Sequence, residues 1–159
     1  MIKVSVTILT YNQKEFIGKA IESALSQKTN FDVEILVGDD CSTDGAQETI
    51  LAYQEKYPDK VKAVLHSKNL GQNGLFNTIE TLKLAKGTYI APMDGDDYWT
   101  DDQKLQRQVD FMEVHPDFSA CFHNALITYE DGTPSHELNS PDQKDVITAE
   151  DLVGEDEIW

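Results

Sequence analysis

Residues 2–25 read IKVSVTILTYNQKEFIGKAIESAL, and this stretch points to the fold class. Its first eight residues are mostly β-branched or apolar, as in a buried strand. A polar turn, Thr10-Tyr11-Asn12, follows, and apolar side chains then recur at the spacing of an amphipathic helix. We predict that Asn12 caps this helix, with Glu15 three residues later completing a capping box. The stretch therefore predicts a strand, a turn and a helix in succession.

The same unit recurs further along the chain. Patterning predicts strands over residues 31–37, 61–65 and 88–93, and helices over residues 47–57 and 75–85. Strands that alternate with helices of this length are typical of right-handed βαβ crossovers. We therefore expect an α/β fold, a Rossmann-like α/β/α sandwich with a mostly parallel central sheet and helices on both faces.

The remaining sequence is less regular. Leu105, Val109 and Met112 mark one face of a further helix, and residues 118–127 have the composition of a strand. Asp44 together with Gln47 is expected to cap the second helix. We predict a core domain over residues 1–133, followed by a polar, acidic tail over residues 134–159.

The charge of the chain excludes several partners. Of 159 residues, 29 are Asp or Glu and 13 are Lys or Arg, which gives a formal charge of −16. Residues 1–93 carry 10 basic and 11 acidic side chains, whereas residues 94–159 carry 3 and 18. Such a protein repels nucleic acid and anionic lipid, whose affinity comes largely from Lys and Arg. We expect no nucleic-acid partner.

Two further observations concern the cellular environment. Cys41 and Cys121 form no disulfide framework or metal-ligand spacing, and we interpret both as reduced. No run of about 18 apolar residues could span a membrane, and no signal-peptide pattern is present. We expect a cytoplasmic location.

Polar clusters follow each of the first four predicted strands: Thr10-Tyr11-Asn12, Asp39-Asp40, residues 66–74, and Asp94-Gly95-Asp96-Asp97. In an open parallel sheet, ligands bind outside the carboxyl ends of the strands, near the point where strand order reverses. Four clusters at one edge indicate a single site.

The last cluster indicates a cation. Carboxylates as close as Asp94 and Asp96 repel each other unless a cation lies between them. Hard oxygen ligands favour Mg²⁺ or Mn²⁺, which take their remaining ligands from water and substrate phosphates. The motif thus implies a diphosphate substrate, with a solvated acidic turn as the alternative. No Walker sequence or G-x-G-x-x-G is present, which argues against P-loop kinases and dinucleotide dehydrogenases.

Four segments in register resemble the N-terminal half of family 2 glycosyltransferases, which adopt the GT-A fold. They are VSVTILTYNQKEFIGKAIESALSQ, EILVGDDCSTDG, NLGQNG and GTYIAPMDGDDYW. The resemblance covers about residues 1–125. It implies a nucleotide-sugar (donor) binding core and an inverting transfer of sugar from a nucleoside-diphosphate donor, UDP-type favoured, assisted by Mg²⁺ or Mn²⁺.

The resemblance also assigns roles to residues. Thr10, Tyr11 and Asn12 match the loop that lines the nucleoside, and Asp40 matches the aspartate that bonds the base, with Asp39 beside it. Asn69 and Gly71 match the segment under the diphosphate. Asp96 matches the metal ligand, and Asp94 matches a second metal or ribose contact. Phe76 stands where many members place a basic residue.

The implied mechanism is a single displacement in which a carboxylate takes the proton of the acceptor hydroxyl. We expect that base beyond Trp159, in an acceptor-side region that follows the acidic tail. The acceptor would be a carbohydrate or a lipid-linked sugar in bacterial surface polysaccharide or lipopolysaccharide synthesis, at the inner face of the membrane. The alternatives are a non-catalytic nucleotide-sugar-binding module and, ranked lowest, a phospho-acceptor signalling domain.

Overall fold

The structure is a computed structural model that describes residues 1–129, 131–148 and 151. The chain divides into two compact units, residues 1–118 and residues 119–159. The first unit contains a four-stranded sheet and its helices. Its elements are β1 (Ile2–Thr10), α1 (Lys14–Leu25), β2 (Asp32–Asp39), α2 (Ala46–Lys56), β3 (Val61–Leu65), the 3₁₀ turn η1 (Gln72–Gly74), α3 (Leu75–Leu82), β4 (Tyr89–Asp94) and α4 (Lys104–Val114).

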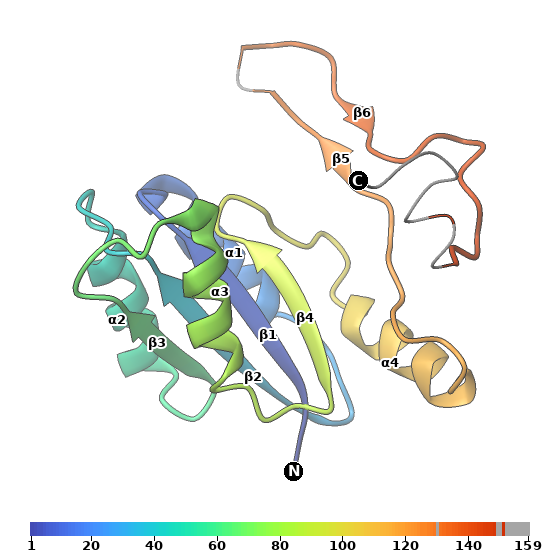
Figure 1. The fold of residues 1–159 in the computed structure, drawn as a ribbon, viewed down its shortest axis with the longest axis horizontal. Helices are drawn as coiled ribbons and strands as arrows, with labels where there is room; N and C mark the ends of the chain where they lie inside the picture. The colour runs from blue at the N-terminus through green and yellow to red at the C-terminus, as the bar shows by residue number, and fades with distance from the viewer. Residues whose placement is uncertain (130, 149–150, 152–159) are drawn as a thin grey trace. The chain divides into compact units, whose positions relative to one another are not determined.

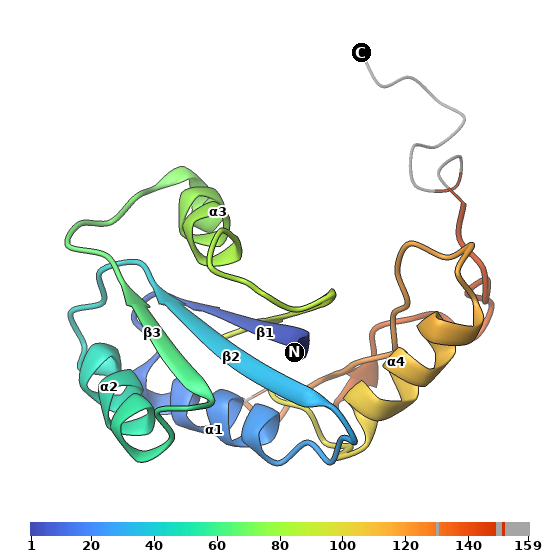
Figure 2. The ribbon, with the colours of Figure 1, turned by 90° about the horizontal axis from the view of Figure 1, so that it is seen from below.

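The sheet confirms the predicted α/β class. Its strand order is β3-β2-β1-β4, and every pair is parallel. The chain moves outward from β1 to β3 and then returns to the other side of β1 to form β4. Because parallel crossovers are right-handed, this reversal places the third helix on the opposite face from the first two. Figure 2 shows α1 and α2 on one face of the sheet and α3 on the other.

The two faces of the sheet are buried in different ways. Alternate residues of β1 enter an apolar core with α1, α2 and α4. This core contains Val4, Val6, Ile8, Ile17, Ala20, Ile21, Ala24, Ile35, Val37, Ala46, Ile50, Val61, Met93, Leu105 and Val109. On the α3 face, the buried side chains include the polar groups Ser5, Thr7, Asn77 and Thr81. Gly38 lies beneath α3, where an added Cβ would come within 2.6 Å of Asn77 Oδ1.

The helix caps agree with the prediction only in part, at Asp44. Helix α1 begins after Gln13, and Asn12 does not cap it. Instead, Asp44 accepts hydrogen bonds from the first backbone N–H of both helices, Lys14 N at 2.8 Å and Ala46 N at 3.0 Å. The predicted partner Gln47 bonds Asp39 rather than a cap position. One carboxylate thus serves two helix N-termini, which sequence spacing does not reveal because Asp44 is 30 residues from Lys14.

The second unit contains a short antiparallel pair, β5 (Leu126–Ile127) and β6 (His136–Glu137). The predicted strand over residues 118–127 is therefore wrong except at its end. Phe118 instead packs its ring on Phe111 and His115 at the end of α4, with centroids 5.6 and 5.9 Å apart. Within the described residues, positions 118–125 have no partner strand. The predicted acidic tail lies partly outside the described residues, and the boundary at residue 133 stays a prediction.

Among the residues that the structure describes, no helix is both long enough and apolar enough to cross a membrane.

Candidate functional site

The carboxyl ends of the four parallel strands lie at one edge of the sheet (Figure 1). Strand order reverses between β1 and β4, because the chain reaches β2 and β3 on one side of β1 and β4 on the other. Ligands of open α/β sheets bind at such a reversal point. The loops that leave β1 and β4 therefore meet where a ligand site is expected.

The acidic turn follows β4 directly. The backbone N–H of Gly95 donates to the carbonyl of Leu9 at 2.8 Å, and the N–H of Asp97 donates to the carbonyl of Asp94 at 3.1 Å. Gly95 is buried, and a Cβ there would come within 2.7 Å of both Thr10 Cβ and Gln13 Oε1. Only glycine fits this contact, so the close approach of the β1 loop fixes the turn that presents Asp94 and Asp96.

The loop after β1 is bonded to the loop after β2. Thr10 is buried, and its hydroxyl donates to Gln13 Oε1 at 3.0 Å, whereas Tyr11 is half exposed. Asn12 has a left-handed backbone, with φ 55°. Its N–H donates to Ser42 Oγ at 2.8 Å, and its Oδ1 accepts from the N–H of Thr43, also at 2.8 Å. Asn12 thus joins two loops.

The two aspartates after β2 have different environments. Asp40 is 4% exposed, its N–H donates to the carbonyl of Thr10 at 3.0 Å, and its Oδ1 accepts from the N–H of Leu70 at 2.7 Å. Asp39 is fully buried, and its Oδ1 accepts from Ser42 N and Gln47 Nε2. Asp40 therefore faces the loop after β3, while Asp39 faces α2.

The loop after β3 completes the edge. Asn69 donates from Nδ2 to the carbonyl of Asp40 at 3.2 Å and accepts from the N–H of Gly71 at 2.9 Å. Gly71 and Gly74 both have positive φ, 72° and 81°, which glycine adopts at little cost. The buried Asn77 donates to the carbonyl of Gly38 at 2.9 Å and lies 3.0 Å from His66 Nε2. The loop is thus bonded to Asp40, just after β2, and α3, which follows the loop, is bonded to Gly38 within β2.

These loops enclose an open cavity of about 660 Å³. Seven of the predicted site residues line it: Thr10, Tyr11, Asp40, Asn69, Gly71, Asp94 and Asp96. Asn12 and Asp39 do not. The other lining residues are Leu9, Gln13, Gln72, Asn73, Gly74, Asn77 and Thr78. Gln13 was missed, although its position directly after the predicted turn Thr10-Tyr11-Asn12 could have suggested it.

The cavity is acidic. Three of its lining residues are aspartates, and none of the described lining residues is Lys or Arg. Beside the cavity, desolvation by the surrounding protein and then the charges of Asp96 and Asp94 raise the pKa of the Asp97 carboxyl. The negative charges in the turn therefore repel one another.

The residues of the turn fit a hard divalent cation. Carboxylate oxygens suit Mg²⁺ or Mn²⁺, and a cation would relieve the repulsion that, after desolvation, raises the pKa of Asp97. Within the described part of the chain, no three His, Cys, Asp or Glu side chains converge as a preformed cage. Such ions commonly use one or two carboxylates and complete their coordination with water and phosphate. The chemistry of Asp94 and Asp96 is consistent with that arrangement.

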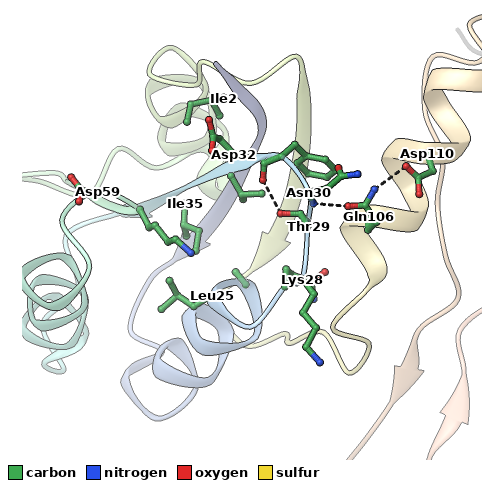
Figure 3. Close-up of a pocket in the computed structure, with 15 residues that line it drawn as sticks. Ile2, Leu25, Lys28, Thr29, Asn30, Asp32, Ile35, Asp59, Gln106 and Asp110 are labelled. Carbon is green, nitrogen blue, oxygen red and sulfur yellow. Dashed lines mark hydrogen bonds between the residues drawn. The ribbon is translucent and has the colours of Figure 1, made fainter.

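A larger groove, of about 1000 Å³, lies at the opposite, amino-terminal edge of the sheet (Figure 3). Its polar groups bond each other: Gln106 accepts from the N–H of Asn30 and donates to Asp110, both at 2.8 Å. Lys28 pairs with Asp102 beside the groove at 2.5 Å. Three aspartates, Asp32, Asp59 and Asp110, also line this groove, but Lys28 and Lys60 line it with them, unlike at the other edge.

Known proteins are similar to this chain in sequence. The profile described as glycosyl transferase family 2 matches residues 5–152. An uncharacterized protein of Mycobacterium tuberculosis is 38% identical over 135 residues, which are 85% of this chain and 38% of that protein. The UDP-Glc:alpha-D-GlcNAc-diphosphoundecaprenol beta-1,3-glucosyltransferase WfaP of Escherichia coli is 38% identical over 115 residues, 72% of this chain and 43% of its own.

Solved structures share the fold. Residues 1–349 of Staphylococcus aureus TarS in complex with UDP-GlcNAc have 32% identity and a TM-score of 0.60, over 72% of this chain and 32% of that one. The mannosyltransferase PcManGT of Pyrobaculum calidifontis, in complex with GDP-Man and Mn²⁺, has 25% identity and a TM-score of 0.59, over 69% and 32%.

The chain thus spans less than half the length of these two relatives. The family profile nevertheless covers most of the chain, and the solved relatives share its fold. This chain belongs to glycosyl transferase family 2.

Proposed function

We propose that this chain is the donor-binding part of a metal-dependent glycosyltransferase that uses a nucleoside-diphosphate sugar, with a UDP-type donor favoured. The observation that carries the proposal is the cavity at the strand-order reversal, lined by Asp40, Asp94 and Asp96 without any Lys or Arg among its described residues. A diphosphate could enter such a cavity only if a cation offset both its charge and that of the aspartates.

Asp96 and Asp94 would hold Mn²⁺ or Mg²⁺. When bound, the cation would neutralise the diphosphate and stabilise it as a leaving group. The chain's own residues would orient the donor: Asn69 and Gly71 under the diphosphate, and Gly71 with φ 72° allowing close approach of the backbone. These roles agree with the position of both residues in the cavity lining.

The nucleoside would lie against the β1 and β2 loops. Asp40 is held by Leu70 and Thr10 in the cavity wall, where its carboxylate could accept a hydrogen bond from a base or ribose. Tyr11, half exposed in the same wall, offers an aromatic face. A UDP-type donor is favoured because TarS was solved with UDP-GlcNAc and WfaP is named for UDP-Glc. The GDP-Man complex of PcManGT makes GDP sugars the next donors to test.

The reaction would be an inverting displacement by an acceptor hydroxyl, with the base supplied by chain beyond Trp159. A lipid-linked sugar is the acceptor class we favour, because the name of WfaP specifies a diphosphoundecaprenol acceptor. Such acceptors belong to surface polysaccharide assembly at the inner face of the membrane.

The experiment is a calorimetric titration of UDP into this chain with and without Mn²⁺. We expect binding that requires Mn²⁺ and a loss of at least about 100-fold in affinity on Asp96→Ala, since even indirect support of a metal ligand contributes 10–100-fold. Asp110→Ala, in the groove at the opposite edge, is the matched control and should bind as the wild type does.

Metal-independent binding of UDP, or an unchanged affinity in Asp96→Ala, would contradict the proposal. Turnover of a UDP sugar by the 159-residue chain in the presence of a lipid-linked sugar acceptor would exclude a purely non-catalytic binding module.

A further inference from the structure

We propose that Asp39 is a positioning residue for nucleotide binding: its buried carboxylate holds together the two loops that shape the cavity, without touching the nucleotide. The inference rests on the proposed function and refines it. Family resemblance places Asp39 beside the base-binding aspartate, but Asp39 is fully buried and does not line the cavity. Its influence on a ligand must therefore pass through its neighbours.

The contacts of Asp39 are concentrated on one oxygen. Oδ1 accepts from the N–H of Ser42 at 2.9 Å and from Gln47 Nε2 of α2 at 2.6 Å. The backbone carbonyl of Asp39 accepts from the N–H of His66 at 3.1 Å. One residue thus connects the end of β2 to its own loop, to α2 and to the end of β3.

The hydrogen bonds continue to the β1 loop. Ser42, held by Asp39, accepts from the N–H of Asn12, and the N–H of Thr43 donates to Asn12 Oδ1. Asn12 has a left-handed backbone and lies between Tyr11 and Gln13, both of which line the cavity. The hydrogen bonds from Asp39 through Ser42 to Asn12 therefore determine the positions of the Tyr11 and Gln13 side chains. The bonds that the Asp39 carboxylate accepts from Ser42 and Gln47 are charge-assisted and therefore stronger than the neutral bonds to Asn12.

The second carboxylate oxygen of Asp39 indicates why an aspartate, and not an asparagine, suits this position. Among the described residues, Oδ2 is the one buried side-chain oxygen or nitrogen without a hydrogen-bond partner. Asparagine has the same shape, but it would either bury its N–H donors at the Oδ2 position, where Asp39 has no hydrogen-bond partner, or turn them toward Ser42 N and Gln47 Nε2, which are themselves donors. A carboxylate avoids both outcomes, since it carries no donor. The position is therefore sensitive to a change of a single atom.

The test compares four variants by titration of UDP in Mn²⁺: Asp39→Asn, Gln47→Ala, the double variant, and Asp32→Asn. We expect the affinity for UDP to fall about 10-fold in Asp39→Asn and by less in Gln47→Ala, in the range of losses for residues that orient a ligand-binding group. Gln47 does not line the cavity, so its variant tests the inference even if Asp39→Asn fails to fold. Asp32→Asn makes the same chemical change at the exposed first residue of β2 and should leave UDP affinity unchanged.

Two readouts separate positioning from contact and from general damage. The double variant should lose no more than the weaker-binding single variant, because both act through the same bond, whereas a direct contact by Asp39 would make the losses multiply. Binding of Mn²⁺ alone should stay within twofold of the wild type, and the amide resonances of Asn12 and Thr43 should shift in the ligand-free Asp39→Asn protein.

Unchanged UDP affinity in both single variants, multiplying losses, or unmoved amide resonances would each overturn the inference while leaving the proposed function intact. If the wild type itself binds no UDP in Mn²⁺, the proposed function fails, and the inference fails with it.

Discussion

The two edges of the sheet differ in chemistry more than in size. The groove at the amino-terminal edge is the larger, about 1000 Å³ against about 660 Å³ at the carboxyl-terminal edge. In the larger groove, Gln106 bonds both Asn30 and Asp110, and two lysines line the groove together with its three aspartates. At the smaller cavity, Asp94 and Asp96 face the same space, and Asp97 beside them has a raised pKa.

The difference teaches that volume alone does not locate a ligand site. Polar groups that already bond each other are stabilised little by a ligand. Neighbouring like charges are stabilised strongly by a cation, because it offsets their repulsion. Topology favours the same edge, since strand order reverses between β1 and β4 at the carboxyl ends. If this comparison is right, substitutions at one edge should change nucleotide binding, and substitutions at the other should change only stability.

The largest effect is expected from Gly95→Ala. The added Cβ would lie 2.7 Å from Thr10 Cβ and from Gln13 Oε1, so the acidic turn or the β1 loop must move. We expect UDP affinity in Mn²⁺ to fall by more than 10-fold and the free energy of unfolding to fall by about 3 kcal/mol, at the upper end for overpacked sites. Calorimetry and urea unfolding measure the two quantities.

Gly18→Ala, within α1, is the matched control. An added Cβ at Gly18 would meet Tyr53 Oη at 3.7 Å, an ordinary van der Waals distance. It should stabilise the protein by about 0.5–1 kcal/mol through helix propensity, with unchanged UDP affinity. Normal UDP binding by Gly95→Ala would show that the close contact does not fix the acidic turn.

The next effect is expected from Asp44→Ala, which removes hydrogen bonds from the first turns of α1 and α2 together. We expect a loss of about 1–2 kcal/mol in the free energy of unfolding, the range for caps. The hydrogen bond from Lys14 N is the main cause that lowers the pKa of Asp44 below its ordinary 3.8. Its stabilisation is therefore present above pH 3.8 and is lost as the pH falls through the lowered pKa.

Urea unfolding of Asp44→Ala and of the wild type across this range should show the difference between them shrinking towards low pH. A difference that stays constant between neutral pH and the acid limit would show that Asp44 does not stabilise the helices as an anion.

A smaller effect is expected at the opposite edge from Gln106→Leu. The change removes the acceptor of Asn30 N and the donor to Asp110, both in exposed positions, so the free energy of unfolding should fall by about 0.5–1 kcal/mol. UDP affinity in Mn²⁺ should equal that of the wild type. A loss of nucleotide binding as large as that of Gly95→Ala would break the comparison between the two edges.

Much of the fold could be predicted because each strand-turn-helix unit carries its own periodic pattern. Residues 2–9, 31–37 and 61–65 were predicted as strands to within two residues. The prediction of a strand over residues 118–127 was wrong, because periodicity cannot reveal whether a partner strand exists. Phe118 packs against aromatic rings at the end of α4 instead.

The candidate site was predictable to the extent that polar residues at strand ends share an edge. Thr10, Asp40, Asp94 and Asp96 do meet in one cavity. What sequence could not supply was the direction of each side chain at irregular backbone. Asn12, with φ 55°, bonds the neighbouring loop, and its separation of 30 residues from Ser42 hides that partner.

The smallest effect is expected from Asp97→Asn. The raised pKa of Asp97 means that its ionised form is disfavoured in the folded protein, first by desolvation and then by Asp96 and Asp94. Above that pKa, removal of the charge should therefore stabilise the metal-free protein, by a few tenths of a kcal/mol, the size typical of exposed charge pairs. Saturating Mn²⁺ should shrink or reverse this gain, because a cation held by Asp96 already offsets the repulsion.

Thermal unfolding in chelator and in Mn²⁺ measures the gain in stability without and with the cation. Asp102→Asn, which removes a carboxylate paired with Lys28, is the control and should show no gain under either condition. An equal gain with and without Mn²⁺ would mean that no cation binds near this turn, and the contrast between the two edges would lose its electrostatic basis.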